Sequence, residues 1–168
     1  KEVTMADFDC FDHTPQELLI LPYLIFNDPE MAGDTLMAKK FLPFIEQTRQ
    51  MYDHRKNPFH NFRHGITVMQ STYFILKTTK AGEYYGETEK KAMLFASLMH
   101  DIDHTGRNNI FETASRSGLA LNYNDISVLE NHHCATAFRI IKTDEVNIFS
   151  NLSHDNFRKF RRVAIEAI

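Results

Sequence analysis

The chain has 168 residues, of which 43% are hydrophobic and 24% charged, enough for one domain with a hydrophobic core. Its formal net charge of −3 gives no reason to expect nucleic acid as a partner. The sequence has only two cysteines, which does not indicate a disulfide framework. No apolar run is long enough to span a membrane, and the start lacks the layout of a signal peptide. We therefore expect a cytoplasmic protein, or one at the cytosolic face of a membrane if an anchor lies outside this chain.

Apolar residues recur at helical spacing along the chain, and no stretch alternates with period two for long, so the sequence predicts an all-α fold, a compact multi-helix bundle. Thr14 and Pro15 mark the start of the first helix, and Pro43 indicates a kink or a restart within the second. The composition of residues 27–34 and 79–88 predicts loops. The expected helices cover residues 12–26, 35–52, 61–78, 89–100, 111–123 and 126–141, with a further one from 153.

Six of the nine histidines fall between His60 and His133, which is the clustering that a metal site produces. The spacing of His60 and His64 places two imidazoles one helical turn apart on one face. A second imidazole pair, His100 and His104, has a carboxylate beside it in Asp101. Imidazoles suit zinc and similar ions, and a carboxylate can bridge two metals. The pattern therefore predicts a metal-dependent hydrolase.

Individual roles follow less directly from the residues alone. His64, His100 and Asp101 have the spacing of metal ligands, whereas His60, near a helix start, could face a substrate. The remaining candidates could ligate directly or orient metal-bound waters, and they are His104, Glu130 and His133. Asn109 follows the metal block and could supply a functional hydrogen bond.

Two other histidines are expected to have ordinary structural roles. His132 is adjacent to His133, so it is expected to face elsewhere and to pack or donate to the backbone. His54 lies in an expected break between helices and should be solvated.

Two other kinds of protein compete with the hydrolase. One is a di-iron helical bundle, since Glu130-x-x-His133 is an element of such sites, but those sites need a second such element and the sequence has none. The other is a non-catalytic helical metal-binding module descended from an enzyme.

Three ordered blocks of sequence together resemble class I cyclic nucleotide phosphodiesterases. His100-Asp101-x-x-His104-x-x-x-x-Asn109 is similar to the signature of that family, residues 58–64 (PFHNFRH) to a second block, and residues 123–133 (YNDISVLENHH) to a third. Within the family, these phrases and residues 147–151 (NIFSN) most resemble phosphodiesterase type nine, which prefers cyclic GMP.

The resemblance implies an all-helical catalytic domain with Zn²⁺ and Mg²⁺, or Mn²⁺ at the second site, sharing a bridging hydroxide. It implies that His60 is the general acid, that Asp101 reaches both ions and that Phe59 contributes to substrate binding. The zinc ligands that it implies are His64, His100 and Asp101. The residues that it places around the waters of the second ion are His104, Asn109, Glu130 and His133.

The implied reaction is hydrolysis of a 3′,5′-cyclic nucleotide, cyclic GMP before cyclic AMP, to the 5′-monophosphate, and a homodimer is one option for assembly. Residues 1–168 are expected to be the N-terminal part of a single catalytic domain, because the last helix is still amphipathic at Ile168. A further metal-binding aspartate, a purine-reading glutamine and an aromatic clamp are expected beyond it. The isolated chain should therefore turn over little substrate.

Overall fold

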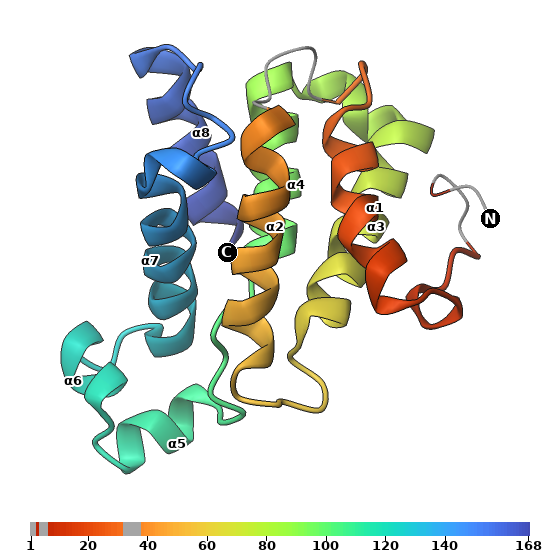
Figure 1. Cartoon of the computed structure of the whole chain (residues 1–168). Helices are drawn as coiled ribbons and strands as arrows, with labels where there is room; N and C mark the ends of the chain where they lie inside the picture. The colour runs from red at the N-terminus through yellow and green to blue at the C-terminus, as the bar shows by residue number, and fades with distance from the viewer. Residues whose placement is uncertain (1–2, 4–6, 32–37) are drawn as a thin grey trace.

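The computed structural model, which describes residues 3, 7–31 and 38–168, confirms the all-α prediction (Figure 1). Within these ranges there is no strand, and no helix is both long and apolar enough to cross a membrane. Short 3-10 helices cover Cys10–Asp12, Lys80–Tyr84 and Asp144–Val146. The α-helices are α1 (Pro15–Phe26), α2 (Ala38–Asp53), α3 (Phe62–Thr78), α4 (Glu87–Met99), α5 (Asn109–Ala114), α6 (Gly118–Tyr123), α7 (Val128–Lys142) and α8 (His154–Ala167).

The expected helix boundaries hold best where capping residues mark them. Thr14 caps α1 by accepting a hydrogen bond from the amide of Glu17, whose side chain binds the Thr14 amide in return. The expected restart at Pro43 is wrong, because α2 runs through it without a break. The expected start of that helix at residue 35 lies outside the described residues.

The single helix expected over residues 111–123 is wrong, because α5 and α6 are separate. The chain turns between them at Arg116, whose φ of 52° is left-handed. The loop expected at 79–88 contains the 3-10 helix Lys80–Tyr84.

Aromatic side chains form the centre of the core around α4. Phe95 of α4 has its ring centroid 5.5 Å from that of Phe149 and 5.3 Å from that of Phe160 in α8, and the last two are 4.4 Å apart. All three rings are at most 2% exposed. Burial of each contributes roughly 1.5–3 kcal/mol, so this cluster holds α8 against α4.

The ends of four helices meet at one end of the bundle, the lower end in Figure 1. There α2 and α4 finish and α3 and α7 begin. Tyr52, near the end of α2, is fully buried; its hydroxyl donates to the Leu98 carbonyl at 2.8 Å and accepts from the Asp101 amide at 3.3 Å. The chain leaving α4 is therefore tied to the end of α2.

Gly65 lets α3 approach this junction closely. A Cβ at this position would lie 2.9 Å from the Leu98 carbonyl oxygen and 3.0 Å from the Tyr52 hydroxyl oxygen. We expect Gly65→Ala to lower the free energy of unfolding by about 1–3 kcal/mol through overpacking, measured by urea denaturation. Gly118→Ala is the matched control, because a Cβ there meets nothing within 4 Å. Equal stability of the two variants would contradict the close-packing argument.

A partly buried ion pair joins the segment after α1 to α3. The Asp28 carboxylate accepts from the Tyr73 hydroxyl at 2.6 Å and from Lys77 at 3.0 Å. Burial alone would raise the pKa of Asp28, but the hydrogen bonds from Tyr73, the Glu30 amide and Lys77 outweigh burial and lower the pKa. The folded state therefore holds this carboxylate ionised at a pH where the unfolded chain protonates it.

Asp28→Asn is expected to lower the free energy of unfolding at pH 7 by about 1.5–3 kcal/mol, the usual contribution of hydrogen bonds to a charged group. Because the folded pKa is depressed, this contribution is present above the unfolded pKa of about 3.9 and is lost as the pH falls below it. Urea unfolding at pH 7 and pH 3 should show the two proteins converging at the lower pH. The same difference at both values would contradict this assignment.

Candidate metal centre

Three segments that are distant in sequence bring imidazoles to this junction. His60 precedes α3, and His64 lies in its first turn, where the Asn61 side chain caps the helix by accepting from the His64 amide at 3.2 Å. His100 is the residue that ends α4, and the chain then turns through residues 101–104. His133 comes from the second turn of α7 and is almost completely buried.

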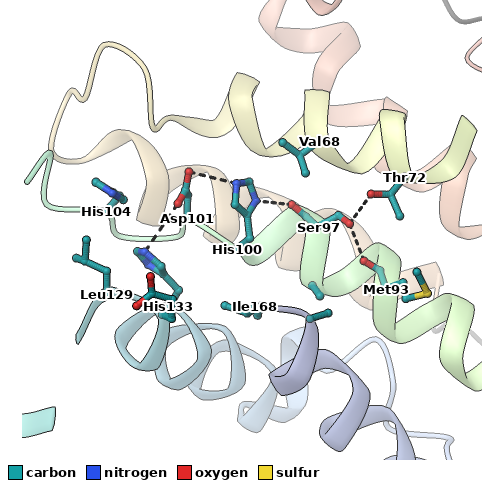
Figure 2. A pocket seen from close by; sticks show the side chains of 13 residues that line it. Val68, Thr72, Met93, Ser97, His100, Asp101, His104, Leu129, His133 and Ile168 are labelled. Carbon is teal, nitrogen blue, oxygen red and sulfur yellow. Dashed lines mark hydrogen bonds and ion pairs between the residues drawn. The ribbon is translucent and has the colours of Figure 1, made fainter. Parts of the chain in front are cut away.

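Asp101 lies at the centre of these rings. One carboxylate oxygen, Oδ2, is 2.8 Å from His60 Nδ1, 3.1 Å from His64 Nε2 and 3.2 Å from His100 Nε2. The other, Oδ1, is 3.9 Å from Nε2 of His133. Figure 2 shows Asp101 between His100 and His133. One carboxylate is thus shared by two sets of imidazoles.

The donor atoms fit a pair of metal ions. Among the described residues, two groups of potential ligands have their donor atoms within 4.8 Å of one another, and both contain Asp101. The first joins it to His60 and His64, and the second to His104 and His133. His100 adds to the first, since its Nε2 is 3.2 Å from Nε2 of His64.

The separations around the first group match a tetrahedral ion. The donor atoms of His64, His100 and Asp101 form a triangle with sides of 3.1–3.2 Å. Zinc bonds of about 2.0–2.2 Å require tetrahedral ligand atoms roughly 3.3–3.5 Å apart. His100 Nδ1 donates to the Ser97 carbonyl at 2.8 Å, so Nε2 is the nitrogen of this ring that lies in the triangle and would bind the metal after giving up its proton; Figure 2 shows His100 between Ser97 and Asp101.

The surroundings favour the ionised carboxylate and neutral rings at His64 and His133, whereas at His100 burial is outweighed by the hydrogen bond and charge of Asp101, which raise the pKa. Burial opposes ionisation of Asp101, but hydrogen bonds from His100 and His60 hold its pKa well below the usual range. Burial, and secondarily the His100 charge, lowers the pKa of His64. Burial also lowers the pKa of His133 to about 4. Metal binding needs neutral imidazoles, because only a neutral imidazole has a free lone pair, so a metal ion would displace the proton that Asp101 favours on His100.

His104 differs from the other rings in its available nitrogen. Its Nδ1 accepts from the Gly106 amide at 2.9 Å, which assigns the proton of the neutral ring to Nε2. The ring stacks on His60, with centroids 3.8 Å apart, and lies parallel to His133 at 5.5 Å. The free nitrogen of His104 therefore suits donation to a water or an anion.

Glu130 and Asn109 bind each other beside the cluster. The Asn109 amide nitrogen donates to the two Glu130 carboxylate oxygens at 3.2 and 3.0 Å, while its carbonyl oxygen accepts from the Leu129 amide. Glu130 also lines a cavity of about 400 Å³ together with His100, Asp101, His104 and His133. A cavity of this size can hold a nucleotide-sized ligand.

Phe59, the expected substrate contact, is 63% exposed. Its ring centroid lies 4.7 Å from that of His64 and 5.0 Å from that of His60. It does not line the cavity described above but, with His60, a neighbouring one of about 420 Å³. Its role in substrate binding stays a prediction.

One histidine prediction is wrong and a second omitted a contact, and in both cases the contact is with Asp103. His132 was expected to pack or to donate to the backbone, but its Nε2 is 2.8 Å from the Asp103 carboxylate. His54 is exposed as expected, with 42% of its side chain accessible, but its Nε2 is also 2.8 Å from this carboxylate, which accepts from Arg55 as well. Burial would raise the pKa of Asp103, but the bonds from His132 and Arg55 and the Arg55 charge lower the pKa to about 2. The only sequence signal for this cluster was the position of Asp103 inside the metal block.

The fold and the site define an all-helical protein with a carboxylate shared by two groups of imidazoles. Residues 59–168 match the family model described as 3′5′-cyclic nucleotide phosphodiesterase. The chain belongs to this family.

Curated relatives match along nearly the whole chain. It is 44% identical over 165 residues to the human high affinity cGMP-specific 3′,5′-cyclic phosphodiesterase 9A, covering 96% of this chain and 27% of that protein. It is 34% identical over 172 residues to the 3′,5′-cyclic-nucleotide phosphodiesterase regA of Dictyostelium discoideum, covering 100% of this chain and 21% of that protein. The chain thus spans about a quarter of the length of these relatives.

A solved structure has the same fold. The phosphodiesterase domain of the RhoPDE fusion protein from the choanoflagellate Salpingoeca rosetta matches with a TM-score of 0.91 and 39% identity. The match covers 98% of this chain and 51% of that one.

Proposed function

We propose that the protein containing this chain hydrolyses 3′,5′-cyclic nucleotides to 5′-monophosphates with the help of two divalent metal ions. The observation that carries the proposal is the sharing of Asp101 between two groups of imidazoles beside a cavity of nucleotide size. Family membership supports the choice of substrate class. We also propose that residues 1–168 are the N-terminal part of one catalytic domain, since they align with about half of the solved domain.

The donor set suggests which residues hold which ion. His64, His100 and Asp101 would hold zinc, because two imidazoles and a carboxylate at tetrahedral spacing suit that ion. Asp101 would also contact a second ion, Mg²⁺ or Mn²⁺, that prefers oxygen and retains waters. His104, Glu130, His133 and Asn109 surround that side. When bound, the two ions would lower the pKa of a shared water and neutralise charge on the phosphate.

The chain's own residues would orient the substrate and supply a proton. His60 Nδ1 is engaged by Asp101, so Nε2 is the nitrogen free to protonate the 3′ oxygen as the ring opens. Nε2 of His104, with its proton assigned, would donate to a phosphate oxygen or to an attacking water. Phe59 beside His60 offers an exposed aromatic face to a bound nucleotide.

Cyclic GMP is the preferred substrate in this proposal. The support is the 44% identity to a relative named as specific for cyclic GMP. The test is hydrolysis of cyclic GMP and cyclic AMP, each alone, by the full-length protein loaded with Zn²⁺ and Mg²⁺. A higher kcat/KM for cyclic GMP is expected. A higher value for cyclic AMP would overturn the preference, and no hydrolysis of either would overturn the enzymatic activity.

The two alternative functions predict different outcomes in the same experiment. A non-catalytic module would bind metal and hydrolyse neither nucleotide. A di-iron site is disfavoured because, within the described residues, His133 is grouped with Asp101 and His104, while Glu130 is bonded to Asn109. Iron bound to the purified protein, together with oxygen-dependent chemistry, would support the di-iron alternative instead.

A further inference from the structure

Asp103 lies in the same turn as Asp101 but has a different set of partners. Its Oδ1 accepts from Arg55 Nε at 2.6 Å and lies 2.8 Å from His54 Nε2, and its Oδ2 lies 2.8 Å from His132 Nε2. The side chain is only 10% exposed. Both oxygens are occupied, and Asp103 belongs to neither group of potential metal ligands. Its carboxylate therefore serves the protein framework.

The partners of Asp103 come from two elements that border the metal centre. His54 and Arg55 directly follow α2, whereas His132 is in α7 next to His133. The residue before Asp103 makes a parallel contact, because His133 Nδ1 donates to the Ile102 carbonyl at 2.7 Å. Two consecutive residues of the turn thus hold two consecutive residues of α7.

The backbone at Asp103 adds to the need for these contacts. Its φ is 57°, in the left-handed region that side chains other than glycine seldom adopt. Such a conformation persists when the surroundings hold it in place. Here the surroundings are the three side chains on the carboxylate.

We propose that Asp103 is a positioning residue of the metal centre: by tying the turn to the end of α2 and to His132, it sets the separation of Asp101 and His133. That separation, 3.9 Å between Oδ1 and Nε2, spans the second group of potential ligands. The first group of potential ligands depends less on Asp103, because His64 comes from α3 and the Tyr52 hydroxyl separately binds the Asp101 amide. The inference rests on the proposed metal site.

Asp103→Asn in the full-length protein tests this role, since asparagine keeps the shape but cannot accept from all three donors. We expect Mn²⁺ affinity, measured by titration of metal-free protein, to fall by about 10–100-fold, the usual effect of losing a partner behind a ligand. Zn²⁺ affinity should fall less. The electron paramagnetic resonance spectrum of bound Mn²⁺ should also change, which a simple loss of stability would not cause.

Asp28→Asn is the matched control, because Asp28 is similarly buried and also accepts bonds from two side chains, away from the metal centre. It should lower stability and leave Mn²⁺ affinity unchanged. A second pair of variants distinguishes loss of the positioning contact from misfolding of the protein. His132→Gln retains an N–H donor and should keep affinity within a few-fold of the wild type, whereas His132→Leu should reproduce the loss.

The outcomes separate the two proposals. Wild-type Mn²⁺ affinity and spectrum in both Asp103→Asn and His132→Leu would overturn the positioning role alone, as would an equal loss in Asp28→Asn. A wild-type protein that binds neither Zn²⁺ nor Mn²⁺ would overturn the metal site and the positioning role together. Selective loss of Mn²⁺ affinity with rescue by glutamine supports the role.

Discussion

Asp101→Asn is expected to lower the affinity of the full-length protein for both Zn²⁺ and Mn²⁺ by more than about 100-fold. Loss of a partner behind a ligand typically costs 10–100-fold, and Asp101 is itself the carboxylate common to both groups of potential ligands. Asparagine has nearly the same shape but lacks the negative charge. The measurement is metal content after equilibrium dialysis, supported by titration of the metal-free protein.

The control for Asp101→Asn is an aspartate whose charge lies far from the centre. Asp144 is 85% exposed and pairs with Lys40 at 2.8 Å, a surface ion pair worth no more than about 1 kcal/mol. Asp144→Asn should bind both metals like the wild type. Retention of wild-type Zn²⁺ affinity by Asp101→Asn would show that the convergence of rings on this carboxylate does not form a metal site.

The parts of this centre that could be predicted from sequence have local signals. The spacing of His60 and His64, and the adjacency of His100 and Asp101, identify residues that lie together whatever the rest of the fold does. The expected start of the helix at residue 61 is also close to the observed one, since Asn61 is the N-cap of α3. The sequence blocks that resemble the family contain these same residues, so the resemblance and the local spacing identify the same candidates.

The Asp103 cluster could not be predicted because its contacts are not local. His132 is 29 residues away in sequence and His54 is 49 away, so no spacing rule relates them to Asp103. The break between α5 and α6 was missed for a different reason. It occurs at Arg116 with a positive φ, and the Ser117-Gly118 pair that follows is a turn signal that the prediction of one continuous helix overlooked.

His60→Asn is expected to lower kcat for cyclic GMP by about 10²–10⁴-fold while leaving Zn²⁺ and Mn²⁺ content unchanged. The His60 side chain is 33% exposed, and its Nδ1 lies 2.8 Å from Asp101 Oδ2, so the other nitrogen remains accessible to a substrate. An asparagine amide can replace the hydrogen bond to Asp101 but cannot transfer a proton to a leaving oxygen near neutral pH. His154→Asn, at a histidine that is 90% exposed, is the control and should turn over normally.

A substrate that does not need an acid separates proton donation by His60 from a merely structural role. A nitrophenyl phosphodiester releases a stable phenolate, so a proton donor contributes little to its cleavage. The His60→Asn protein should therefore hydrolyse it at close to the wild-type rate while failing on cyclic GMP. An equal loss on both substrates would mean that His60 maintains the site, since its ring stacks on His104 at 3.8 Å. Normal turnover of cyclic GMP would remove His60 from the chemistry altogether.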